Sequence, residues 1–173
     1  MKKFIILSIT IIVLTLGLFL PTSKAIVFYD KQTDEIIAYR PATTGDYFDI
    51  IFVHSIHLTD VTEKYVIIED DKIKQYEMIF SQFGIGMPSE VEDEEEIYYK
   101  DGFYHITNMN HLFEALHIRN GKTVSEHRFV WKDKNGEEHQ VYLNEYMEPG
   151  ASFELKVRNL SLIDRWKEVK VDE

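Results

Sequence analysis

The stretch YFDIIFVHSIHLTDVTE, residues 47–63, decides the fold. Its first residues are almost all apolar or aromatic, and they end abruptly in a polar string that begins at His54. This pattern predicts a central β-strand with polar groups at its end. Alternation along a strand places His54 on the same face as Phe48 and Phe52, where core side chains are expected. A histidine in that position must find a hydrogen-bond partner or stay neutral.

The size and composition of the chain indicate one domain. Its 173 residues, 45% of them hydrophobic and 13% aromatic, suffice for one proper core but not for two. The chain has no cysteine, so no disulfide and no lipid-modified cysteine anchor is expected. The core alone must therefore stabilise the fold.

The first 25 residues have the form of a secretory signal segment. A basic start at Lys2 precedes an apolar run over residues 4–20, and small residues follow at Ser23 and Ala25. This order, with small residues two apart, matches what a signal peptidase recognises. We therefore expect residues 1–25 to direct export.

Retention of this segment is the alternative to cleavage. The apolar run lies at the lower limit for spanning a bilayer as a helix, so residues 1–25 are a signal peptide or an N-terminal membrane anchor. The break at Pro21 favours cleavage. In both cases residues 26–173 are expected to form an exported domain, secreted or at the extracellular face of the membrane.

The charge of the chain excludes some partners. Removal of residues 1–25 would take away Lys2, Lys3 and Lys24 and no acidic residue, so the formal net charge would change from −11 to −14. An acidic domain is a poor candidate for binding nucleic acid or anionic lipid. We therefore expect no nucleic-acid partner, and we expect contact with a membrane only if the N-terminal segment is not cleaved. Cationic partners, divalent metal ions or simple solubility suit this charge.

Beyond residue 26, turn signals recur between β-rich runs, which predicts an all-β domain: a single antiparallel sandwich or barrel of about nine or ten strands. Residues 62–68 and 73–80 are expected to continue the central strand as a meander. Residues 152–158 alternate most cleanly, and residues 160–166 are expected as a final strand or one helical turn. The expected hairpins join residues 26–29 to 35–39, 98–99 to 103–104, 112–118 to 123–131, and 129–131 to 139–143.

His54 is the first candidate for chemistry, as a ligand donor, a general base or a metal ligand. The alternative is a buried histidine whose ring is satisfied by backbone or by a carboxylate. Glu63 is the expected carboxylate partner, because a turn around residues 56–60 would bring it back beside His54. His127 shares a predicted strand face with Trp131, so it is expected to approach His54 in the interior.

Other chemical signals are weak. His54 and His57 would point to opposite faces of a strand, which disfavours a shared zinc ion unless the turn begins at Ser55. Ser55 lacks the G-x-S-x-G context of a hydrolase nucleophile. The acidic run over residues 90–96 lacks the Asp/Asn ladder and glycine of a calcium loop, so a solvated loop is expected. No metal, cofactor or catalytic residue is assigned.

Three short motifs carry a family resemblance. They are F-x-x-x-F-x-H-S-I over residues 48–56, Glu63 with Tyr65, and F-G-I-G-M-P over residues 83–88. Together they resemble the bacterial family known as domain of unknown function 1850, and the likeness extends over residues 26–157. The resemblance implies a small exported or anchored β domain, often encoded beside tripartite ATP-independent (TRAP) transporters whose extracytoplasmic receptor is of the TAXI type. It implies no activity.

The leading hypothesis is a non-enzymatic exported accessory domain that binds a subunit of a TRAP-type (TAXI) transporter or its small-molecule solute. One alternative is a secreted hydrolase with His54 as base and Glu63 orienting it, and another is a cell-surface structural module. The predicted ligand-binding residues are His54, Ser55, Glu63, Gly84, Gly86, Met87 and His127.

Overall fold

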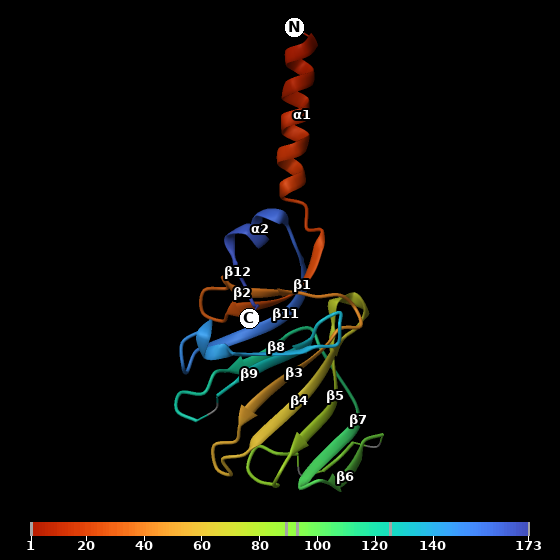
Figure 1. Cartoon of the computed structure of the whole chain (residues 1–173), viewed down its shortest axis with the longest axis vertical. Helices are drawn as coiled ribbons and strands as arrows, with labels where there is room; N and C mark the ends of the chain where they lie inside the picture. The colour runs from red at the N-terminus through yellow and green to blue at the C-terminus, as the bar shows by residue number, and fades with distance from the viewer. Residues whose placement is uncertain (1, 89, 93, 125, 173) are drawn as a thin grey trace.

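The computed structural model describes residues 2–88, 90–92, 94–124 and 126–172. In these residues, twelve strands form two sheets, with the orders β12-β2-β1-β11-β8 and β10-β9-β3-β4-β5-β7-β6 (Figure 1). The small sheet contains β1 (Ser23–Asp30), β2 (Ile36–Pro41), β8 (Leu116–Arg119), β11 (Ser152–Leu160) and β12 (Val169–Lys170). The large sheet contains β3 (Tyr47–Val53), β4 (Asp60–Ile67), β5 (Ile73–Phe80), β6 (Glu96–Lys100), β7 (Phe103–Phe113), β9 (Arg128–Lys132) and β10 (Glu138–Tyr142).

Helices are few in the described chain: α1 (Lys2–Leu18), α2 (Leu162–Lys167) and the 3-10 turns η1 (Glu69–Asp71) and η2 (Leu143–Glu145). Ser161 begins α2 with a reciprocal cap, because its hydroxyl accepts from the Asp164 N–H and its own N–H donates to the Asp164 carboxylate. Of the two alternatives expected for residues 160–166, the helical turn is the one that forms.

Aromatic side chains join the two sheets across the core. Phe28 of β1 meets Phe129 of β9 edge-to-face, with ring centroids 5.5 Å apart, and Phe48 of β3 lies 5.5 Å from the same Phe129 ring. All three rings are almost completely buried. Burial of such rings is a main source of folding free energy in a chain without disulfides. The sandwich-like arrangement is confirmed, and in the described residues both strand orders are open, without closure into a barrel.

The central strand and its meander are confirmed. β3 covers residues 47–53, and its neighbours are β4 and β9. Phe48 and Ile50 face the core, as the alternation predicted. β4 and β5 then follow in antiparallel order, which is the expected meander.

The predicted hairpin between residues 112–118 and 123–131 is wrong. β7 ends at Phe113, and the chain crosses to the small sheet, where β8 pairs with β11. Burial of Leu116 beside Leu155 outweighs the local Asn-Gly turn signal. This crossover, with the short edge strands, gives twelve strands where nine or ten were expected.

The N-terminal helix stands apart from the sandwich. α1 extends along the long axis of the molecule, and none of its residues is buried (Figure 1). In the part of the chain that the structure describes, no helix combines the length and the apolar character needed to cross a membrane. β1 begins at Ser23 and buries Ala25, so the expected boundary after residue 25 lies inside a paired strand.

Candidate functional site

His54 joins two loops at the end of the large sheet. Its Nδ1 accepts hydrogen bonds from the backbone N–H groups of His57 (3.2 Å) and Ile56 (3.4 Å). Because Nδ1 accepts, the ring proton is on Nε2, which donates to the Ile85 carbonyl at 3.0 Å. The side chain is buried and both ring nitrogens are engaged by backbone. Of the two roles considered for His54, the geometry supports the backbone-satisfied one.

Gly84 allows the two loops to approach each other, because a side chain at position 84 would not fit. A Cβ at position 84 would lie 2.4 Å from Nε2 of His57, and the His57 ring stacks on the His54 ring at 4.7 Å. The glycine at position 84 therefore allows a close approach of the backbone to the His57 ring. We call His54, His57, Gly84 and Ile85 the distal lock.

Glu63 does not join the distal lock. The register pairs Val53 with Asp60 and Ile50 with Glu63, so Glu63 lies about 13 Å from His54 along the strands. Its carboxylate instead accepts a hydrogen bond of 2.8 Å from the Tyr65 hydroxyl. Burial raises the pKa of Glu63, and the hydrogen bond from Tyr65 opposes this rise. The expected His54–Glu63 pair was wrong because the turn ends at Thr59 and β4 begins earlier than was assumed.

His127 is buried beside a different residue of β3. Its ring stacks on Phe52 with centroids 5.4 Å apart, and its Nδ1 accepts from the Gly121 N–H at 3.5 Å. Burial lowers the pKa of His127 to about 4, so the imidazole is neutral at pH 7. Within the described residues, no hydrogen bond links His127 to His54 or Glu63.

The remaining predicted residues gather around the distal lock. Ser55 is exposed in the turn after β3, Gly86 has a positive φ of 88°, and Met87 packs on the apolar cluster beneath the loop. The Met87 N–H donates to the Gly84 carbonyl at 3.0 Å and closes the turn. The structure thus brings His54, Ser55, Gly84, Gly86 and Met87 to one end of the sandwich, apart from Glu63 and His127.

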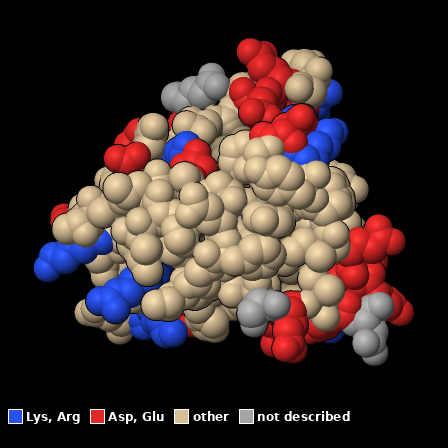
Figure 2. Space-filling model, turned by 90° about the horizontal axis from the view of Figure 1, so that it is seen from below, with Lys and Arg blue, Asp and Glu red and all other residues tan. Residues whose placement is uncertain are grey.

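The two loops present apolar side chains to solvent. Ile56, Leu58, Phe83 and Ile85 are exposed, and we call them the distal apolar surface. Figure 2 looks at this end and shows a broad expanse free of Lys, Arg, Asp and Glu, with charged side chains gathered at its rim. An exposed apolar cluster with a charged rim is typical of an interaction surface.

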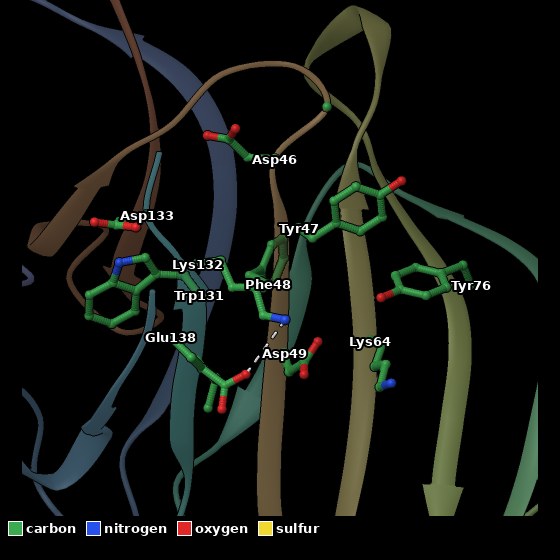
Figure 3. Close-up of a pocket in the computed structure, with 12 residues that line it drawn as sticks. Asp46, Tyr47, Phe48, Asp49, Lys64, Tyr76, Trp131, Lys132, Asp133 and Glu138 are labelled. Carbon is green, nitrogen blue, oxygen red and sulfur yellow. Dashed lines mark ion pairs between the residues drawn. The ribbon is translucent and has the colours of Figure 1, made fainter. Parts of the chain in front are cut away.

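Sequence reasoning missed a pocket of about 450 Å³ on the outer face of the large sheet. Figure 3 shows Asp49 of β3 and Lys64 of β4 on neighbouring strands, with Tyr76 and Trp131 on either side. Burial raises the pKa of Asp49 to about 6, and Lys64 opposes the rise. The available signal was the single acid within YFDIIF. Acidic and basic side chains are mixed in the lining of the pocket, so the lining does not favour either an anionic or a cationic ligand.

Ligand atoms for a metal ion converge in two groups of described residues. One group is Glu92, Glu95 and His111, and the other is Asp133, Glu137 and His139. In the second group, Oδ1 of Asp133 already accepts the Asn135 and Glu137 N–H groups at 2.8 Å each, as in a capped turn. In the first group the side chain of Glu95 is only 6% exposed, so the expected solvated acidic loop was wrong at this residue.

A comparison with protein families shows a match to a family model. The model described as Domain of unknown function (DUF1850) matches residues 48–137, which is more than half of the chain. The matched range begins in β3 and contains the distal lock, the acidic loop and β7. No curated protein and no solved structure matches the chain.

Proposed function

Since the chain belongs to the DUF1850 family, whose function is unknown, we propose that it is an exported, non-enzymatic accessory domain. In this proposal it binds the extracytoplasmic receptor subunit of a TRAP-type (TAXI) transporter through the distal apolar surface. The observation that carries the proposal is the exposure of Ile56, Leu58, Phe83 and Ile85 on loops held in place by the distal lock.

Preorganised loops support a binding role. His54 hydrogen-bonds to both loops, and the hydroxyls of Thr59 and Ser81 meet at 2.6 Å beside it. Loops fixed before binding lose little conformational entropy when a partner docks. The apolar side chains are the anchors of such a contact, because a partner that covers them removes apolar area from water.

The shape of the molecule supports a partner at the end of the sandwich opposite α1. α1 leaves one end of the sandwich and the distal loops occupy the opposite end (Figure 1). α1 exposes apolar side chains that no other described element buries, and although no helix of the described chain is long and apolar enough to cross a membrane, these side chains support a contact of α1 with lipid. With α1 against lipid, the distal apolar surface points away from the bilayer, toward the compartment of a receptor subunit.

Retention of residues 1–25 fits the same arrangement. Ser23, Lys24 and Ala25 belong to β1 and pair with Leu160, Asn159 and Arg158 of β11. Lys24 also forms an ion pair of 2.8 Å with Asp71. Cleavage after Ala25 would remove these contacts from the small sheet, so the proposal includes an uncleaved N-terminal segment.

The hydrolase alternative gains no support from the site. General-base catalysis by His54 needs a ring nitrogen free to take a proton, and both are engaged by backbone groups. Glu63, the proposed orienting group, is bonded to Tyr65. Accordingly, the accessory role is the function that we propose.

Site-specific photo-crosslinking tests the proposed contact. A photoreactive amino acid is placed at Ile85, which is 83% exposed, and in a matched control at Trp166 of α2, which is 85% exposed at the other end of the sandwich. After irradiation in the native membrane, we expect the transporter receptor subunit to be crosslinked from position 85 and not from position 166. The intact mass of the purified protein is expected to include residues 1–25.

Three results would each contradict a part of the proposal. Equal crosslinking of the receptor from both positions would show that the distal loops do not make the contact. If only unrelated envelope proteins are crosslinked from position 85, the claim that the partner is a transporter subunit is contradicted. A mass that lacks residues 1–25 would separately overturn retention.

A further inference from the structure

We propose that Glu92, Glu95 and His111 form a binding site for a divalent transition-metal ion of the zinc type. The site lies where β7 runs past its neighbour. β6 pairs with residues 103–107 of β7, so the following residues of β7 extend beyond it. The acidic loop before β6 lies against this extension and brings two carboxylates to His111.

The distances in this group suit a shared ion. Nε2 of His111 is 3.0 Å from Oε1 of Glu95 and 3.5 Å from Oε1 of Glu92. Metal–ligand bonds of about 2.0–2.2 Å in tetrahedral geometry separate two ligands by about 3.3 Å. The two observed separations lie on either side of this value, and all three ligand atoms lie within 4.8 Å of one another, which suits a single ion between them.

Two of the three ligand atoms lack a hydrogen bond. Oε1 of Glu95 and Nε2 of His111 are buried and, within the described chain, neither has a hydrogen-bond partner. The other oxygen of Glu95 accepts the Glu92 N–H at 2.9 Å, which fixes the carboxylate with Oε1 directed at His111. Buried polar atoms are normally paired, and leaving them unpaired costs free energy. A cation between them satisfies both atoms at once.

The donor types select the class of ion. One imidazole nitrogen with carboxylate oxygens suits zinc and related transition ions, whereas calcium takes six to eight oxygen ligands. A pocket of about 500 Å³ adjoins the group and is lined by Glu94, Asn108 and Asn110 as well as the two carboxylates. It leaves room for a fourth ligand, from water or from one of these side chains.

A simple histidine–glutamate ion pair is the competing explanation. The chain contains such a pair on the small sheet, where Nδ1 of His117 lies 3.0 Å from Oε1 of Glu154. That pair has one carboxylate and an exposed histidine, and neither of its atoms is among the buried atoms without a partner. The group at His111 has a second carboxylate and two such atoms, which is why we assign the metal to it.

Metal titration of the purified full chain in detergent tests this site. Zinc chloride binding is measured by calorimetry, and Co²⁺ is used as a spectroscopic probe of a nitrogen-containing site. We expect one ion per chain and a rise in the melting temperature on binding. Glu95→Gln and His111→Gln are each expected to weaken zinc binding at least tenfold, roughly the scale on which altered metal sites lose affinity.

Matched controls separate this site from other acidic residues. His117→Gln removes the histidine of the exposed pair, and Glu137→Gln alters the second group of ligand atoms. Both controls are expected to bind zinc like the wild type, and far-UV circular dichroism checks that every variant is folded. If Glu95→Gln does not fold, Glu92→Gln takes its place, with the same expected loss.

The inference is overturned by any of three results. The first is no binding heat and no Co²⁺ absorption at millimolar metal. The second is wild-type affinity in both Glu95→Gln and His111→Gln. The third is binding lost in Glu137→Gln, which would place the ion at the β9–β10 turn. None of these results bears on the crosslinking of the distal apolar surface, so the two proposals fail separately.

Discussion

Two histidines, His54 directly after β3 and His111 in β7, contact the same β5–β6 connection in opposite ways. Both ring nitrogens of His54 form hydrogen bonds with backbone groups, and the bond to the Ile85 carbonyl fixes the loop around Ile85. Within the described chain, the buried Nε2 of His111 faces two carboxylates and has no hydrogen-bond partner. A histidine with satisfied nitrogens has a structural role, whereas one facing unsatisfied carboxylates has the capacity to bind an ion.

The largest expected effect comes from His54→Ala. It removes a buried ring and leaves the Ile85 carbonyl and the His57 N–H unpaired, so we expect a loss of about 4 kcal/mol in the free energy of unfolding. His111→Ala, in buffer with a chelator, is expected to cost less than about 1 kcal/mol. Urea unfolding of both variants measures the difference. Equal losses would break the distinction between the two histidines.

A pH titration extends the comparison to His127. Its pKa is about 4 in the folded chain and about 6.5 when unfolded, so between these values the unfolded state binds more protons. Its contribution to stability is therefore present above pH 6.5 and lost as the pH falls to 4, by roughly 3 kcal/mol. Denaturant unfolding of the wild type and of His127→Phe should diverge over this range. Parallel pH profiles would mean that His127 is charged or exposed in the folded protein.

Gly84→Ala has a smaller expected effect than His54→Ala and tests the packing of the distal lock. The added methyl group would meet the His57 ring, so we expect a loss of about 1–2 kcal/mol. Gly17→Ala in α1 is the matched control, because nothing lies within 4 Å of its Cβ position. Thermal unfolding of both variants provides the measurement. An unchanged melting temperature for Gly84→Ala would show that His57 moves aside freely.

Local patterns predicted the elements that local contacts determine. The alternation in YFDIIF placed β3 and its buried face correctly, and the clean alternation of residues 152–158 matches β11. The same reasoning failed for β8, whose partner β11 is far away in the sequence. A turn signal such as Asn120-Gly121 describes a few residues, while burial against a distant strand involves a whole layer of the core.

The candidate sites also divide into features that a local pattern predicts and features that depend on distant contacts. A histidine closing an apolar strand is visible in the sequence, and so is a glycine that allows close approach to its neighbour. The partner of Glu63 depended on register, where a shift of a few residues moves a side chain away from its expected neighbour. The group at His111 depends on how far β7 extends beyond its pairing with β6. The alternation of apolar and polar residues does not encode this length.

The pairing of β1 with β11 also has a consequence for how quickly the protein folds. Every residue pair between these strands is more than 120 positions apart in sequence. Bringing two strands together across so long a stretch of chain costs conformational entropy before any contact between them is gained. Folds dominated by such distant pairings form on the millisecond-to-second scale. If the chain is delivered N-terminus first, the apolar strand β1 arrives early and can pair with β2, but its other edge stays unpaired until β11 follows. If α1 is held at lipid, as proposed, it would keep this open edge apart from other chains and limit aggregation.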